Sequence, residues 1–350
     1  MIDPEKILVI RFSSIGDVVL STPLLRVLRT RFPLAQIDFV VRKEYADLLS
    51  YNRNINHIYK FEVKDGLSGL YRLKTQLKME HYNLVVDIHN SLRSKYLRMM
   101  IGAKDVAIIN KRILARTLLV RFKKNCYKNI VSVADRYIET VAKYGIKNDS
   151  AGLSLQIPDE IHSAVSAKIN KLGLGRRGNI IGFCPSAKHA TKCWPQERFA
   201  ELGIRLTNGN NVEILLFGGP LDRQKCKYIC DAINASSGET RATSMSGELS
   251  LLETAAAMDL CDLIVTNDSG LMHIATAMKK KIVALFGSTV KEFGFYPVGD
   301  NNIVLERKEL SCRPCSHIGR DSCPEKHFRC MKEIQVEEVL TSIQVLSSRK

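Results

Sequence analysis

The sequence predicts an α/β protein made of two domains, each a doubly wound parallel sheet. Short, continuously apolar segments alternate with amphipathic ones, which is typical of parallel strands covered by helices on both faces. The alternation fades around residues 145–160, where glycine, asparagine and proline gather, and then resumes. We therefore expect one domain at residues 1–155 and a second at 156–350, each large enough for its own core.

The elements follow in order along the chain. In the first half, strands are expected at residues 6–12, 36–41, 57–61, 83–88 and 105–109, and helices at 18–31, 43–50, 67–79, 91–101 and 132–144. In the second half, strands are expected at 179–184, 212–217, 262–266 and 281–286, and helices at 195–207, 221–234, 250–258 and 270–278. A last helix near 335–347 could pack back on the first domain. Because open α/β sheets bind ligands beyond the carboxyl ends of their strands, two such domains predict a cleft between two sheet edges.

The composition is that of an ordinary globular protein, with 45% hydrophobic and 25% charged residues. No run of eighteen apolar residues occurs, so no membrane span is expected. The start, Met-Ile-Asp-Pro-Glu-Lys, lacks the basic-then-apolar order of a secretion signal. We expect a cytoplasmic protein.

The positive charge is concentrated in the first half of the chain. The formal net charge is +16, and residues 1–150 hold 27 Lys and Arg against 14 Asp and Glu. Between Arg93 and Lys128 there are eleven basic residues and one acidic residue. Such a surface attracts nucleic acid, anionic lipid headgroups or a phosphorylated substrate. A basic face that only aids solubility is the alternative.

The first candidate site is the stretch Ser13-Ser14-Ile15-Gly16-Asp17, placed where a strand is followed by a helix. Small residues let a ligand approach the backbone, and glycine permits an unusual turn. A carboxylate at this edge could act as general base toward a bound alcohol. The alternative for Asp17 is a helix N-cap, and the two roles can coexist.

A second candidate is the stretch from Thr266 to His273, which contains Asp268, Ser269 and Gly270. It follows an apolar strand and begins a helix, whose exposed N–H groups suit a phosphate. His273 lies about one turn further and could bind the same anion. Capping by Asp268 or Ser269 is the alternative, but it leaves His273 unexplained.

Two further turns follow strands in the second domain. The segment from Pro185 to Pro195 holds Ser186, Thr191, Lys192 and the chain's single tryptophan, and a lysine there could neutralise a leaving diphosphate. The turn before Asp222 could contact a ribose or base, or be a plain turn.

Several familiar cofactor motifs are absent or misplaced. Gly173-Leu-Gly175-Arg-Arg-Gly178 has the G-x-G-x-x-G spacing but precedes a strand instead of following one, so we reject it as a dinucleotide loop. There is no P-loop, no H-E-x-x-H and no D-x-D pair of the kind that holds a metal–diphosphate complex.

The ten cysteines fit a reducing compartment, where structural disulfides are rare. Four are clustered with the spacing C-x2-C-x7-C-x6-C, namely Cys312, Cys315, Cys323 and Cys330. One C-x2-C is half of a typical zinc site, but the second half lacks the tight pair. Reduced thiols in a surface loop are therefore favoured over a structural zinc.

Taken together, these motifs resemble the ADP-heptose:lipopolysaccharide heptosyltransferase family, glycosyltransferase family 9, and most of all its heptosyltransferase II members. The S-S-x-G-D turn, the K-C-W-P segment at Lys192, the N-D-S-G-x-x-H stretch and the cysteine-rich tail carry the resemblance, which extends over nearly the whole chain. It implies a GT-B architecture of two Rossmann-like domains, with the acceptor bound by the first and the nucleotide sugar by the second. It also implies an inverting reaction that needs neither metal nor cofactor.

The resemblance assigns roles to individual residues. Asp17 would be the general base and Lys192 would stabilise the leaving ADP, while Ser13, Ser14 and Gly16 would contact the acceptor. The nucleotide sugar would be contacted by Ser186, Thr191, Asp222, Asp268, Ser269, Gly270 and His273, although the family's usual residue at position 222 is glutamate. The acceptor would be the inner core of lipopolysaccharide at the inner-membrane surface, and neither a nucleic-acid nor a protein partner is expected.

Two alternatives stay open at this point. One is a transferase of the same architecture that uses a different nucleotide sugar, which a panel of donors would distinguish. The other is a non-catalytic basic module that binds nucleotides or nucleic acid. That module would bind oligonucleotides in a salt-dependent way and would not depend on Asp17, but few aromatic residues interrupt the basic stretch.

Overall fold

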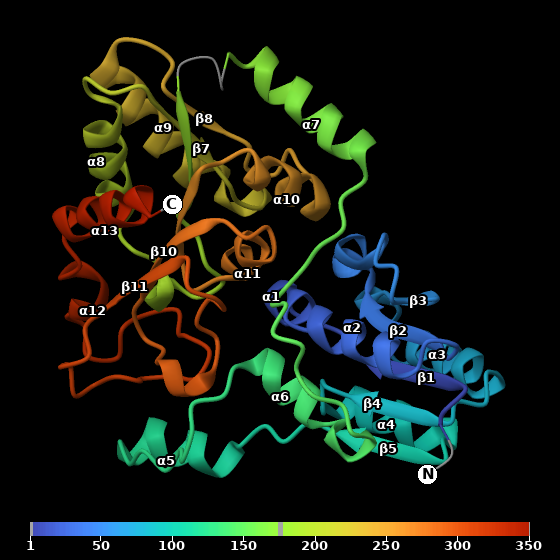
Figure 1. Ribbon diagram of the computed structural model, residues 1–350. Helices are drawn as coiled ribbons and strands as arrows, with labels where there is room; N and C mark the ends of the chain where they lie inside the picture. The colour runs from blue at the N-terminus through green and yellow to red at the C-terminus, as the bar shows by residue number, and fades with distance from the viewer. Residues whose placement is uncertain (1–2, 174–177, 350) are drawn as a thin grey trace. The chain divides into compact units, whose positions relative to one another are not determined.

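The computed structural model describes residues 3–173 and 178–349, so the centre of the Gly173–Gly178 motif lies outside the described residues. The chain forms two compact units. We call residues 1–112 and 131–156 the N-terminal unit, and residues 113–130 and 157–350 the C-terminal unit. The sequence places the boundary at 155/156, and it contains no signal that residues 113–130 belong with the second half. Figure 1 shows the elements of both units.

Within the described residues, the N-terminal unit is built on a five-stranded parallel sheet with the order β3-β2-β1-β4-β5. Its strands are β1 (Lys6–Ile10), β2 (Gln36–Arg42), β3 (His57–Phe61), β4 (Leu84–Asp87) and β5 (Asp105–Ile108). Its α-helices are α1 (Ile15–Val19), α2 (Thr22–Arg31), α3 (Gly66–Met79), α4 (Leu92–Ile101) and α6 (Val133–Glu139), with 3-10 turns at Lys43–Leu49, Val63–Asp65 and Ala142–Tyr144. The central strands are buried on both faces, as the continuous apolar runs predict.

The C-terminal unit holds, in its described part, a six-stranded parallel sheet with the order β11-β10-β9-β6-β7-β8. Its strands are β6 (Asn179–Cys184), β7 (Val212–Leu216), β8 (Ala242–Ser244), β9 (Leu263–Asn267), β10 (Lys281–Phe286) and β11 (Asn302–Glu306). Its α-helices are α5 (Ile113–Phe122), α7 (Asp159–Lys171), α8 (Gln196–Thr207), α9 (Arg223–Ser237), α10 (Leu251–Asp259), α11 (Gly270–Ala277), α12 (Arg329–Lys332) and α13 (Val336–Ser348), with 3-10 turns at Ala190–Lys192, Pro220–Asp222 and Lys291–Phe293.

Both sheets have the doubly wound strand order that the sequence predicts. Chain order reverses between β1 and β4 in one sheet and between β6 and β9 in the other. In open α/β sheets, ligands bind beyond the carboxyl ends of the strands at this reversal point. Residues that bind a ligand are therefore expected in the segments that follow β1, β4, β6 and β9.

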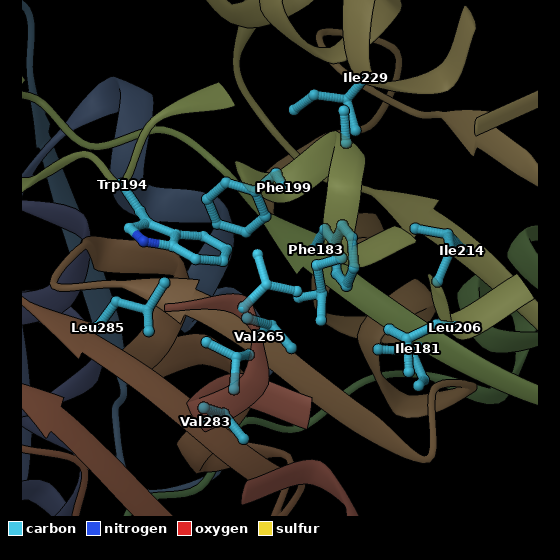
Figure 2. Packing of buried hydrophobic residues seen from close by; sticks show 14 of the residues in the cluster. Ile181, Phe183, Trp194, Phe199, Leu206, Ile214, Ile229, Val265, Val283 and Leu285 are labelled. Carbon is cyan, nitrogen blue, oxygen red and sulfur yellow. The ribbon is translucent and has the colours of Figure 1, made fainter. Parts of the chain in front are cut away.

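The core of the C-terminal unit lies between the sheet and the helices α8, α9 and α13. Figure 2 shows Trp194 and Phe199 above the strand residues Val265, Val283 and Leu285. The two rings pack edge to face with centroids 5.1 Å apart, and the indole N–H donates to the carbonyl of Ile334 at 3.1 Å. This partner leads into α13, which packs against α8, β10 and β11 of the same unit. A contact of this last helix with the first domain stays a prediction.

Several elements differ from the sequence-based expectation. The helix expected at 18–31 is two helices, α1 and α2, because Pro23 in the first turn of α2 cannot donate a backbone hydrogen bond into the preceding turn. The helices α5, α7 and α12 and the strands β8 and β11 were not predicted, and the helix expected at 43–50 is a 3-10 helix. The strand β8 has three residues, and β11 is half-buried along its length, so neither carries a clear apolar period.

Candidate functional site

Asp17 lies at the reversal point of the N-terminal sheet. β1 ends at Ile10, and Asp17 is in the first turn of the short helix α1 that follows. Its side chain is 15% exposed. The sequence therefore placed this carboxylate at the correct edge of the correct sheet.

Four donors hold the Asp17 carboxylate. One oxygen, Oδ1, accepts from the Arg11 guanidinium at 2.6 Å and from the Tyr137 hydroxyl at 3.0 Å. The other, Oδ2, accepts from the backbone N–H and the hydroxyl of Ser14, at 3.1 and 3.0 Å. A carboxylate gripped at both oxygens has its orientation fixed before any substrate binds.

These donors also decide the charge state of Asp17. Burial alone would raise its pKa, but the Arg11 charge and the hydrogen bonds from Ser14 and Arg11 outweigh burial, so the pKa lies below the ordinary value. The same pair raises the pKa of Arg11 despite its burial, and burial raises the pKa of the Tyr137 hydroxyl. Asp17 is therefore ionised at neutral pH and can accept a proton.

The capping alternative is partly right and needs one correction. Ser14, not Asp17, is the N-cap of α1, and Asp17, at the third helical position, accepts the reciprocal hydrogen bond from the Ser14 backbone N–H. Gly16 is buried and Ser14 is exposed. The acceptor contacts expected of Ser13, Ser14 and Gly16 stay predictions.

Arg11 and Tyr137 are site residues that the sequence reasoning missed. Tyr137 belongs to α6, 120 residues from Asp17 along the chain, and is fully buried. The residues around Tyr137 form no motif that would have predicted its contact with Asp17. Arg11 could have been noticed, because a charged residue directly after a buried apolar strand requires a partner.

His89 follows β4, the other strand at this reversal point. Burial, together with the charges of Arg11 and Lys111, lowers the pKa of His89 to about 4. Its Nδ1 atom is buried and has no hydrogen-bond partner in the described part of the chain. His89 is therefore a neutral imidazole in the same neighbourhood as Asp17.

In the C-terminal unit, Asp268 and Lys192 come together at the corresponding reversal point. Lys192 follows β6 and Asp268 directly follows β9. The Lys192 ammonium lies 2.7 Å from Asp268 Oδ2, and the Thr289 hydroxyl donates to the same oxygen at 2.6 Å. Asp268 is 5% exposed and Lys192 14%. Asp268 thus positions the lysine, and its own direct contact with a nucleotide sugar stays a prediction.

Two buried hydroxyl groups follow the same two strands, Ser186 after β6 and Ser269 after β9. The side-chain oxygens of Ser186 and Ser269 are buried without a hydrogen-bond partner among the described residues. Ser269 precedes Gly270, which begins α11 with its unpaired N–H groups. His273, 3% exposed, is on the first turn of that helix and packs near Phe295. Buried donors without partners are expected where a polar ligand binds.

Two of the expected nucleotide-sugar contacts have other partners. The Thr191 hydroxyl, 2% exposed, accepts from the backbone N–H of Arg320 at 2.8 Å and lies 3.2 Å from the Ser288 hydroxyl. The Asp222 carboxylate accepts from the Gly219 N–H at 2.8 Å and closes a 3-10 turn. Both side chains stabilise the loops that they belong to.

The cysteine-rich segment lies beside Thr191. The side chains of Cys312, Cys315, Cys323 and Cys330 line a cavity of about 10 Å³ together with His327. All four are free thiols. Among residues 3–173 and 178–349, no group of three or more His, Cys, Asp or Glu side chains could hold a metal ion, so the structure gives the zinc alternative no ligand set.

The described helices include none that is long and apolar enough to cross a membrane. In the C-terminal unit the site combines the Lys192 ammonium with buried hydroxyl groups and a helix start, and these hydrogen-bond donors suit a phosphate-bearing ligand. In the N-terminal unit it is a fixed, ionised carboxylate.

The chain is similar to several known proteins. Residues 70–326 match the model of glycosyltransferase family 9 (heptosyltransferase). Lipopolysaccharide heptosyltransferase 2 from Escherichia coli K12 is 28% identical over 314 residues, 82% of this chain and 84% of that protein. The crystal structure of a family 9 glycosyl transferase from Veillonella parvula has a TM-score of 0.81 at 26% identity, covering 98% of this chain and 97% of that one. E. coli ADP-heptose LPS heptosyltransferase II has a TM-score of 0.74 at 24% identity, covering 97% and 98%.

The fold comparison confirms the GT-B type of architecture, with two parallel sheets and their helices. The family match covers well over half of the chain and includes Lys192, Asp268 and His273. The chain belongs to glycosyltransferase family 9, the heptosyltransferase family.

Proposed function

We propose that this glycosyltransferase transfers heptose from ADP-heptose to the inner core of lipopolysaccharide, with Asp17 as general base. The observation that carries the proposal is that the ionised Asp17 carboxylate, at the reversal point of the N-terminal sheet, is held by four hydrogen-bond donors. The names of the relatives, lipopolysaccharide heptosyltransferases, support the donor and acceptor classes.

In the proposed reaction the acceptor hydroxyl attacks the anomeric carbon of the heptose as the bond to ADP breaks. The hydroxyl proton passes to Asp17, the C–O bond to the acceptor forms, and ADP leaves with the bonding electron pair. Attack opposite to the leaving group inverts the anomeric configuration. The low pKa of Asp17 makes it a weak base, which suits a transition state resembling an oxocarbenium ion, because the attacking oxygen becomes acidic only as it bonds.

Negative charge grows on the leaving diphosphate. Lys192 supplies a cation, and the N–H groups near Ser269 and Gly270 and the Ser186 hydroxyl supply hydrogen bonds. Such preorganised donors stabilise charge that develops in the transition state. Since these groups can serve this purpose and the sequence has no D-x-D pair, we propose a reaction without metal or cofactor.

The basic character of residues 1–150 supports an anionic acceptor. We propose that the enzyme works at the cytoplasmic face of the inner membrane, where a lipid-linked acceptor would be presented.

ADP release tests this proposal. The protein is incubated with ADP-heptose and either a heptose-free or a mono-heptosylated inner-core acceptor, in EDTA. Acceptor-dependent release is expected, and the preferred acceptor identifies the step. If neither acceptor supports release, a panel of other nucleotide sugars distinguishes a different donor from a protein without transferase activity.

A further inference from the structure

The segment 113–130, which contains α5, exposes far more apolar surface than a core-packed helix would. All ten residues of α5 are described, and Leu119 alone among them is buried. Leu114 is 75% exposed and Phe122 is 69% exposed. We call residues 113–130 the α5 surface (Figure 1).

Three apolar side chains of α5 share one face, whereas Ile113, 55% exposed, lies about 180° from Phe122 around the helix axis. Leu114, Leu118 and Phe122 are spaced four residues apart, so about 100° per residue places all three within about 80° of one another. Leu118 is half-buried between its two exposed neighbours. The face is therefore a continuous stripe that runs almost the length of the helix.

The α5 surface is also strongly cationic. Residues 113–130 contain five basic residues and no acidic one. In the described part of the chain, Arg116, Arg121, Lys124 and Lys128 have no ion-pair partner. Seven positions after Leu114, Arg121 lies about 20° from it around the helix axis, so cation and apolar stripe are adjacent.

The segment after the helix is fastened to the rest of the C-terminal unit. Lys123 donates to the backbone carbonyls of Cys312 and Pro314 at 2.9 and 2.7 Å, and the Asn125 amide donates to Glu292 at 3.1 Å. Its anchors lie on the loop that carries the cysteines and on the turn near Phe293. These hydrogen bonds hold the C-terminal end of α5 in place on the C-terminal unit.

We propose that the α5 surface docks the enzyme on an anionic lipid bilayer. A helix with an apolar stripe and flanking cations lies in the membrane interface, with the stripe at the headgroup–acyl boundary and the cations at lipid phosphates. Nucleic acid would use the cations but would leave Leu114 and Phe122 exposed to water. The inference rests on the proposed function, since a lipid-linked acceptor makes membrane docking useful.

Vesicle co-sedimentation of the full-length protein tests the docking. Wild type is expected to bind vesicles of phosphatidylcholine mixed with phosphatidylglycerol, to bind them less in high salt, and to bind pure phosphatidylcholine weakly. The double substitution Leu114→Ser with Phe122→Ser, and separately Lys124→Glu with Lys128→Glu, should each lower partitioning by about tenfold or more.

Matched controls have the same chemistry elsewhere. Leu67 and Met79 on α3 are 85% and 75% exposed, so Leu67→Ser with Met79→Ser changes similar apolar area. Lys78→Glu with Lys332→Glu makes the same change in net charge at two exposed lysines. Both controls should bind vesicles like wild type.

Any of four outcomes would overturn the docking proposal. The first three are no binding by wild type, equal losses in the controls and the α5 variants, and loss of ADP release from a water-soluble, acyl-free acceptor in the α5 variants. Binding that falls in the charge variant but not in the Leu114/Phe122 variant would also overturn it and would favour a polyanion such as nucleic acid. Vesicle binding is measured without substrate. Docking without any ADP release would therefore contradict the proposed function and leave the docking intact.

Discussion

Replacing Arg11 with methionine should raise the pKa of the Asp17 carboxyl group. The substitution keeps a long side chain and removes the cation that lies 2.6 Å from Asp17 Oδ1. At an effective dielectric constant of about 20, unit charges about 4 Å apart attract by about 4 kcal/mol. Because the loss of this attraction disfavours the ionised form, the pKa of Asp17 should rise.

The sign of the stability change follows from this shift. In the wild type the pKa of folded Asp17 is depressed, so its ionised form adds stability above the unfolded pKa, and this stability is lost as pH falls through the folded pKa. Arg11→Met weakens this depression of the folded pKa, so the variant should lose less stability than wild type as the pH falls.

The assay is the pH dependence of kcat/KM for ADP release. As the pH falls, Arg11→Met should lose activity at a higher pH than wild type does, because its Asp17 is protonated more easily. Arg11→Lys should restore most of the wild-type profile, and Arg31→Met, which breaks the exposed pair with Asp3, should leave it unchanged. A wild-type profile in Arg11→Met would refute the assigned electrostatics.

Three predictions concern the C-terminal unit, whose folding the fluorescence of Trp194 reports. Asp268→Asn leaves Lys192 without its charge partner, so it should destabilise the unit by about 3 kcal/mol and weaken ADP binding measured by calorimetry, because Asp268 positions the lysine. Unchanged ADP affinity would contradict this role of Asp268. Thr191→Val removes the acceptor of the Arg320 N–H and should cost about 1–3 kcal/mol in urea unfolding, and an unchanged midpoint would contradict this. Gly287→Ala would place the new Cβ atom 2.7 Å from the Thr191 carbonyl oxygen and should lower both stability and ADP affinity. In the control Gly219→Ala the nearest atom is 3.7 Å from the new Cβ atom, so this variant should behave like wild type.

The fold could be predicted from the sequence because its strands are buried on both faces and show continuous apolar runs, as in β1 and β10. Elements without that signal were missed. The exposed helix α5 has one buried residue and so no apolar period facing a core, and the three-residue strand β8 is too short to show one.

The sequence alone places those candidate residues that follow a strand in the same segment of the chain. Asp17, Lys192 and Asp268 follow strands at the reversal points, so local order alone places them. The partners that set their charge could not be found in this way. Tyr137 reaches Asp17 from 120 residues away, and the engagement of Thr191 by Arg320 spans 129 residues. Such pairings depend on tertiary packing.

The most direct test of Asp17 as general base compares wild type with Asp17→Asn in acceptor-dependent ADP release, with ADP affinity measured by calorimetry. The account predicts turnover lowered by about 10²–10⁴-fold with ADP affinity within about twofold of wild type, since the nucleotide contacts that we propose belong to the other unit. Turnover equal to wild type would show that Asp17 only supports the first turn of α1.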